Sequence, residues 1–227
     1  MKIAVLGTGM VGQAIAGRLH ELGHTVVIGT RDPAATLART EPDGMGDPPF
    51  SAWRAAHESV AVATLADAAA SAELVVNASS GAVSLDLLGL AGADNLAGKV
   101  LVDIANPLDF SNGFPPTLFV KDTDSLGEQI QRAFPETKVV KTLNTLNASL
   151  MVDPKSLGES SSIFVSSNDS QAKATVVSLL QSFGHDDVID LGPLETARGT
   201  EMLLPIWLRL MGTLGTGTFN FKIVRSR

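Results

Sequence analysis

The sequence predicts an α/β fold, in which a doubly wound parallel sheet is followed by a small C-terminal α+β part. Six short apolar runs, rich in β-branched residues, alternate with segments of helical periodicity over the first 150 residues. Continuous apolar runs are typical of strands buried on both faces, which occur in parallel sheets covered by helices. The first run leads directly into a glycine-rich turn and a helix, which marks the first crossover unit of such a sheet.

Composition narrows the class of protein. The chain has 227 residues, of which 44% are hydrophobic and 18% charged, enough for a substantial core. A net charge of −7 argues against general binding of nucleic acid, and the absence of cysteine excludes disulfides and thiolate catalysis. The four histidines do not pair at ligand spacing, so no metal site is expected. With no signal-peptide pattern and no apolar run of membrane-spanning length, we expect a soluble, cytoplasmic protein.

The first thirty-one residues form a complete β-α-β pattern. A strand at 2–6 ends in a turn that fits G-x-G-x-x-G, and helical periodicity follows over 10–22 until Gly23, a C-cap residue. A second buried strand is expected at 25–28. This order of strand, glycine turn, helix and strand is the fingerprint of a Rossmann dinucleotide-binding unit. The residues expected to hold the dinucleotide at the turn are Gly7, Thr8, Gly9, Met10, Val11 and Gly12.

Each glycine of this turn has a different expected role. Gly7 permits the tight turn, Gly9 lets the backbone approach the pyrophosphate, and Gly12 lets helix and strand pack closely. The helix N-terminus offers free N–H groups and a partial positive charge to the phosphates. The alternative is a glycine turn in a fold that binds no nucleotide.

The end of the second strand favours NADP over NAD. An NAD-binding unit usually has Asp or Glu there, whereas this chain has Thr30 and Arg31. A guanidinium suits a phosphate dianion, and the Thr30 hydroxyl can add a further hydrogen bond. Asp32 is expected to cap the next helix, with Pro33 at its first position. Alternatively, Arg31 is only a solvated loop residue.

The remaining elements of the first part follow the same alternation. A loop rich in Pro, Gly and Asp is expected at 40–51. Expected helices lie at 33–39, 52–58, 66–72 and 125–134, the last opening with a capping box of Ser125 and Glu128. Expected strands lie at 60–63, 73–78, 99–104 and 137–143.

Polar residues follow three of these strands, where ligands bind in open α/β sheets. Ser79 follows the fourth strand and is expected either to border the cofactor or simply to cap the next helix. Asn106 lies at the tip of the fifth strand and Asn144 at the tip of the sixth. The amides of Asn144 and Asn147 suit the nicotinamide carboxamide, although Asn after a strand, Asn106 included, is also a common turn residue.

The last part, 151–227, differs in kind from the expected Rossmann domain of 1–150. A strand at 162–166, a helix at 170–183 and a strand at 188–191 are expected, with His185 in a surface turn. A long apolar helix over 195–214 is expected to kink at Pro205, and a terminal strand is expected at 219–224. The helix is apolar over a broad face, which predicts either core packing or a homodimer interface.

Four stretches together resemble the NADPH-dependent coenzyme F420 reductases, a family related to the cytosolic domain of STEAP metalloreductases. Besides the glycine turn, they are Gly29-Thr30-Arg31, Leu143-Asn144-Thr145-Leu146-Asn147-Ala148 and Asp190-Leu191-Gly192-Pro193-Leu194-Glu195-Thr196-Ala197-Arg198, and the likeness covers essentially the whole chain. The resemblance implies a Rossmann domain with a small C-terminal part and direct hydride transfer between NADP(H) and the deazaflavin coenzyme F420.

Carried over by motif, the resemblance implies a set of binding residues. Thr8 to Val11 hold the pyrophosphate, and Thr30 and Arg31 hold the 2′-phosphate. Further cofactor residues implied are Ala78, Ser79, Asn106 and Ala148, and residues implied to border the substrate are Asn144, Leu146, Thr216 and Gly217. The chain departs from the family at two places: it lacks a lysine near Ala35, and Ser79-Ser80 replace an apolar-Pro pair.

Hydride transfer between two conjugated rings needs stacking and exclusion of water more than acid–base groups, so no catalytic residue is assigned. An acidic deazaflavin tail would need cations, although solvated surface charge explains most candidates equally well: Lys121, Lys138, Lys141, Arg198, Arg209, Lys222, Arg225 and Arg227. Two alternatives stay open. One is an NADPH-dependent reductase of an imine, a flavin or a ferric chelate, and the other is a non-catalytic NADP(H)-binding redox sensor.

Overall fold

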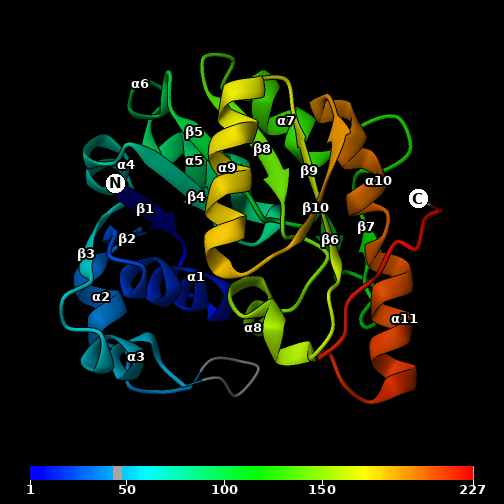
Figure 1. Ribbon diagram of the computed structural model, residues 1–227. Coiled ribbons are helices and arrows are strands. Elements are labelled where there is room, and N and C mark those ends of the chain that lie inside the picture. Colours follow the sequence, from blue (N-terminus) through cyan, green and yellow to red (C-terminus); the bar gives the residue numbers. More distant parts are fainter. Residues whose placement is uncertain (43–47, 227) are drawn as a thin grey trace.

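Eight strands form one twisted sheet in the order β10-β9-β8-β5-β4-β1-β2-β3 (Figure 1). The computed structural model describes residues 1–42 and 48–226, so the middle of the loop expected at 40–51 lies outside the described residues. The sheet strands are β1 Lys2–Leu6, β2 Thr25–Thr30, β3 Ala61–Thr64, β4 Leu74–Asn77, β5 Val100–Asp103, β8 Lys138–Thr142, β9 Ser162–Ser167 and β10 Asp187–Gly192. The predicted α/β Rossmann sheet is confirmed.

One strand pairing departs from the expected parallel sheet. All neighbours are parallel except β8 and β9, which pair antiparallel from Val140 with Ser167 to Thr142 with Val165. Strand β10 then pairs parallel with β9. The strands of 151–227 therefore extend the same sheet as those of 1–150, and the division of the chain at residue 150 stays a prediction.

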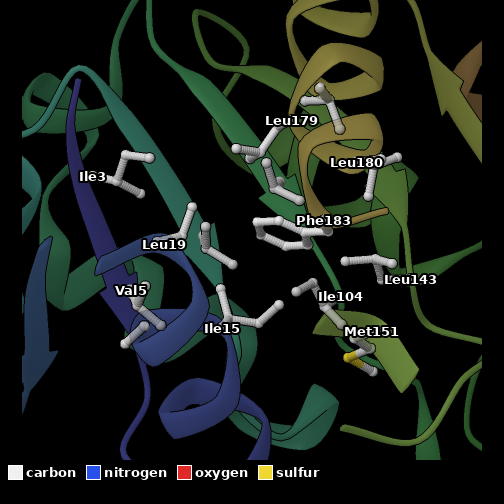
Figure 2. Close-up of a cluster of buried hydrophobic side chains, with 14 of the residues drawn as sticks. Ile3, Val5, Ile15, Leu19, Ile104, Leu143, Met151, Leu179, Leu180 and Phe183 are labelled. Atoms are coloured by element: carbon white, nitrogen blue, oxygen red, sulfur yellow. The ribbon is translucent and has the colours of Figure 1, made fainter. Parts of the chain in front are cut away.

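Helices cover both faces of the sheet, because alternate strand residues point to opposite sides. They are α1 Met10–Glu21, α2 Pro33–Ala38, α3 Phe50–Ala56, α4 Leu65–Ser71, α5 Ser84–Ala91, α6 Ala93–Leu96, α7 Leu126–Ala133, α8 Ala148–Val152, α9 Ser170–Phe183, α10 Ala197–Glu201 and α11 Leu204–Leu214. Figure 2 shows one core cluster, in which Ile15 of α1 and Phe183 of α9 pack with strand residues such as Val5. The second cluster lies on the other face, with residues of α4, α5 and α7.

Two predicted helix starts are confirmed by their hydrogen bonds. The Asp32 carboxylate accepts a hydrogen bond from the N–H of Ala35 at 2.9 Å, and Pro33 occupies the first helical position. The Ser125 hydroxyl accepts from the N–H of Glu128 at 3.1 Å and donates to its carboxylate at 2.7 Å.

The C-terminal prediction was wrong in two respects. The expected helix over 195–214 is two helices, α10 and α11, because Pro205 lacks an N–H and its ring excludes the carbonyl one turn earlier. Pro205 therefore starts α11 instead of kinking a continuous helix. Residues 219–224 form no strand in the described chain. The Phe221 carbonyl accepts one backbone hydrogen bond from Ser162, and the Ser162 hydroxyl accepts one from the N–H of Ile223.

Two short strands, β6 Leu108–Asp109 and β7 Thr117–Leu118, form a separate antiparallel pair that the sequence does not predict. This pair and α11 lie on the same side of the molecule, beside the carboxyl ends of β5 and β8 (Figure 1).

In the described part of the chain, no helix combines the length and the apolar character needed to cross a bilayer.

Candidate functional site

The turn between β1 and α1 is shaped by close backbone contacts. Gly7 has a φ of 131°, which favours glycine, and a Cβ on Gly7 would lie 2.6 Å from the carbonyl oxygen of Ala78. A Cβ on Gly12 would collide with the carbonyl oxygen of Gly7. At Gly9, by contrast, an added Cβ would meet no atom within 4 Å. The turn is thus closed on its protein side and open outward.

The open side of the turn offers backbone donors. Gly9 is the N-cap of α1, and no side chain caps the helix. The first N–H groups of a helix have no partner within the helix, so those of α1 are available to an anion. Thr8, Gly9 and Met10 line a cavity of about 340 Å³ beside this end of α1. A pyrophosphate fits this arrangement.

Cations lie beyond the same turn. Arg31 follows β2 and is exposed, and the half-buried hydroxyl of Thr30 lies 2.9 Å from the hydroxyl of Thr36. Arg39, at the end of α2, lines the 340 Å³ cavity together with Thr8 and Gly9. Sequence reasoning missed Arg39, because no local pattern shows that the end of α2 lies beside the glycine turn.

A second cavity of about 280 Å³ lies over the carboxyl ends of β4, β5 and β8. It joins the glycine turn to the C-terminal helix, since Val11 of α1 and Trp207 of α11 both line it. The predicted site residues that the structure brings together here are Val11, Ala78, Ser79, Asn106, Asn144 and Leu146. Lining residues that the sequence prediction missed include Ile104, Leu108, Phe110, Met151, Trp207 and Leu208.

Besides residues of the glycine turn and of the end of β2, three predicted site residues lie outside this lining. Ala148 is buried at the start of α8, while Thr216 is exposed in the turn after α11. Gly217 lies behind Trp207, since a Cβ on Gly217 would be 3.5 Å from the Trp207 ring, and its carbonyl accepts from the Asn147 amide at 2.6 Å. Gly217 therefore supports the wall of the cavity from behind.

The two predicted amides bond to each other. The Asn144 side-chain N–H donates to the Asn106 side-chain oxygen at 3.0 Å and to the carbonyl of Thr200 at 3.1 Å. The Asn106 N–H donates to the Asn144 carbonyl at 2.8 Å. These bonds join the tips of β5 and β8 to α10, so they hold the strand ends in place around the cavity.

A buried ion cluster lies beneath the cavity. The Lys141 ammonium lies 2.8 Å from the Asp103 carboxylate and 2.8 Å from that of Glu201, and it donates to the carbonyl of Ala105. All three charged side chains are at most 1% exposed. Burial works against the charge of Lys141, but the two carboxylates outweigh it and hold the pKa of Lys141 above its ordinary value.

The cations suggested for an acidic tail separate into groups. Lys141 is ruled out because it is buried in the cluster. Lys138, Arg198, Lys222 and Arg225 are engaged in ion pairs, and Arg227 lies outside the described residues. Lys121 and Arg209 line one cavity of about 380 Å³, which shares Leu208 with the 280 Å³ cavity.

His185 is buried, so its assignment to a surface turn was wrong. Only 2% of the residue is exposed, and its Nε2 lies 3.0 Å from the carbonyl oxygen of Met151, which lines the 280 Å³ cavity. The β10 strand packs the preceding turn inward, which a local pattern of Gly, His and Asp does not reveal. Burial lowers the pKa of His185.

This shift predicts a pH dependence of stability. Since the folded-state pKa of His185 lies below its unfolded value of about 6.5, the unfolded chain takes up the proton first on acidification. The contribution of neutral His185 to the free energy of unfolding is complete above about pH 6.5, and it is lost as the pH falls through the folded-state pKa. Urea unfolding of His185→Gln between neutral and mildly acid pH should give a shallower loss of stability than wild type. An unchanged slope would contradict the assignment.

The site holds few reactive groups. Apolar side chains make up most of the 280 Å³ lining, and the described residues form no group of three or more His, Asp or Glu suited to a metal ion. A cleft of this kind can hold planar rings against each other and exclude water. With the open glycine turn on a Rossmann sheet, it defines the class of NADP-dependent oxidoreductases.

Comparison with known proteins assigns the family within this class. Residues 2–107 match the family model described as NADP oxidoreductase, coenzyme F420-dependent. The F420-dependent NADP reductase of Methanothermobacter thermautotrophicus is 30% identical over 219 residues, which cover 92% of this chain and 89% of that protein. The chain belongs to the F420-dependent NADP reductase family.

Two further proteins, one solved structure and one metalloreductase, are similar to this chain. A crystal structure of a candidate F420-dependent NADP reductase from Arthrobacter sp. FB24 is 67% identical, with a TM-score of 0.96 over 99% of this chain and 100% of that chain. The metalloreductase STEAP3 of Rattus norvegicus is 28% identical over 91% of this chain, but this match spans only 38% of STEAP3.

Proposed function

We propose that this protein transfers a hydride between NADP(H) and the deazaflavin coenzyme F420. The observation that carries the proposal is the continuity of the site: Val11 at the glycine turn and Trp207 on the C-terminal helix line one cavity. Full-length similarity to F420-dependent NADP reductases supports the identity of both partners. When bound, the nicotinamide and the deazaflavin ring would supply the hydride chemistry, one as donor and the other as acceptor.

The residues of this chain bind and orient the two partners. The free N–H groups at the start of α1 suit the pyrophosphate, and Arg31 with Arg39 suits the 2′-phosphate. The apolar walls given by Ile104, Leu146 and Trp207 suit two stacked rings and exclude water from them. These roles follow from position and chemistry.

An acceptor panel tests the proposal. NADPH oxidation is followed by nicotinamide absorbance with oxidised F420, a flavin, an imine and a ferric chelate as separate acceptors. We expect rapid turnover with F420 and little with the others. Turnover only with another acceptor would favour the broader reductase, and tight NADPH binding without any turnover would favour a redox sensor.

Replacing Arg31 tests the choice of NADP over NAD. Arg31→Ala should weaken NADPH binding by roughly 30- to 100-fold, the scale of a lost charge-assisted contact, and leave NADH binding nearly unchanged. Fluorescence titration of both dinucleotides measures this change in affinity. Arg132→Ala is the control, because Arg132 lies on α7 and is paired with Asp124. Equal weakening of NADPH and NADH would show that Arg31 does not contact the 2′-phosphate.

We further propose a homodimer that forms through α11. Ile206 and Leu214 are about half exposed on this helix, and they lie away from the buried Leu204 and Leu208 that face the cavity. Exposed apolar side chains on one helix face are typical of subunit interfaces. We also propose a cytoplasmic location for the protein.

A further inference from the structure

A chain of buried hydrogen bonds leads from the ion cluster to the cavity. Asp103 accepts from Lys141 at 2.8 Å, and its other oxygen accepts from the side-chain amide of Asn77 at 2.9 Å. The amide oxygen of Asn77 in turn accepts from the Ser79 hydroxyl at 2.7 Å. Asn77 and Asp103 are fully buried, and Ser79 lines the 280 Å³ cavity.

The charge of Asp103 fixes the direction of every bond in this chain. All partners of the Asp103 carboxylate are donors, namely the Lys141 ammonium, the Asn77 amide and the N–H of Ala105. An ionised carboxylate only accepts, so Asn77 must turn its NH₂ group toward Asp103. Its oxygen then faces Ser79.

The hydroxyl of Ser79 has a single hydrogen, and its shortest bond is to the Asn77 oxygen at 2.7 Å. The other acceptors within reach, the Ser84 hydroxyl at 2.9 Å and the Ser80 carbonyl at 3.4 Å, also belong to the protein. The Ser84 hydroxyl accepts the second N–H of Asn77 at 3.1 Å. Both N–H groups of Asn77 therefore have partners, and its oxygen is left to accept from Ser79. The Ser84 hydroxyl lies 2.9 Å from that of Ser79 and can donate to it or to the carbonyl of Ser80. Ser79 therefore offers a lone pair, and no hydrogen, to the cavity.

We propose that Ser79 is a hydrogen-bond acceptor for the carboxamide NH₂ of the nicotinamide, with its polarity set by the buried chain Lys141–Asp103–Asn77. This inference rests on the proposed function, since it requires a nicotinamide in the cavity. It adds a defined role for Ser79, which the sequence alone leaves open between bordering the cofactor and capping a helix.

Ser79 is distinguished from the neighbouring amides at the cavity because the protein holds its only hydrogen, so it presents an acceptor without a competing donor. The amides of Asn106 and Asn144 bond to each other, and a side-chain N–H of each is directed to a carbonyl or amide oxygen of the protein. Most of the remaining lining is apolar. A carboxamide NH₂ buried there without an acceptor would lose its hydrogen bonds to water, so an acceptor-only hydroxyl is a complementary group.

The test compares two dinucleotides that differ in one group. NADP⁺ carries the carboxamide NH₂, and its 3-acetylpyridine analogue carries a methyl group there. In Ser79→Ala we expect the dissociation constant for NADP⁺ to rise about five- to tenfold, the scale of one neutral hydrogen bond, and that for the analogue to change less than about twofold. Calorimetric or fluorescence titration measures binding without turnover.

Ser178→Ala is the control, because Ser178 lies on α9 outside the lining of the cavity, where its hydroxyl donates to the carbonyl of Ala174. It should leave both dissociation constants within about twofold of wild type. Asp103→Asn tests the origin of the polarity: its amide can donate to Asn77, which frees the Ser79 hydrogen, so the preference for NADP⁺ over the analogue should fall as in Ser79→Ala.

Three results would overturn the inference. They are equal weakening of both dinucleotides in Ser79→Ala, no weakening of either, or an unchanged preference in a folded Asp103→Asn. Wild-type protein that binds neither dinucleotide would instead overturn the proposed function itself.

Discussion

Lys141→Met is expected to lower the free energy of unfolding by about 3–5 kcal/mol, because it leaves two buried carboxylates without their cation. Methionine is unbranched and only one atom shorter than lysine, so most of the loss comes from charge and little from empty space. For a chain of this size, the melting temperature should fall by roughly 6–20 °C. Urea denaturation and thermal unfolding followed by circular dichroism measure both quantities.

Lys138→Met is the matched control on the same strand. Lys138 is 41% exposed and pairs with Asp169 at 3.3 Å, also near solvent. Exposed pairs of this kind contribute less than about 1 kcal/mol. If both substitutions cost the same, the buried cluster would not be the stabilising element that its geometry implies.

Gly9→Ala is expected to abolish most dinucleotide binding while the protein still folds. The added Cβ meets no protein atom within 4 Å, and the φ of −75° at Gly9 is open to alanine, so folding should be unaffected. The methyl group would stand where the pyrophosphate approaches the amides of α1. Losing two charge-assisted bonds weakens binding by at least about 100-fold.

The control for this substitution is Gly89→Ala on α5, where an added Cβ also meets nothing within 4 Å. It replaces glycine in a helix far from the glycine turn, so NADPH affinity should not change. Equilibrium titration with NADPH measures both variants. Normal NADPH binding by Gly9→Ala would show that the dinucleotide does not lie on this turn.

Elements set by short-range patterns could be predicted from the sequence. The strand, glycine turn and helix of residues 2–21 follow from local periodicity, and the caps at Asp32 and Ser125 follow from residue type. The position of the site also follows, because ligands bind at the carboxyl ends of parallel strands. For this reason Ser79, Asn106 and Asn144 could be placed at the edge of the sheet where the 280 Å³ cavity lies.

Features set by long-range contacts could not be predicted. Lys141 and the partly exposed Lys138 are two lysines of one strand, and only the partners of Lys141 from β5 and α10 show that it is buried. Phe110 and Trp207 reach the cavity through the β6–β7 pair and the break before α11. The direction of β9 depends on its pairing with β8, which its own apolar residues do not encode.

Direct transfer of a labelled hydride is the most decisive measurement for this protein. NADPH carrying deuterium on the transferred position of its nicotinamide ring is mixed with oxidised F420 in ordinary water, and the reduced deazaflavin is analysed by mass spectrometry. We expect the deuterium to appear in the deazaflavin in one-to-one ratio with NADPH consumed. Reduced deazaflavin without the label, or no reduction at all, would contradict hydride transfer across this cavity.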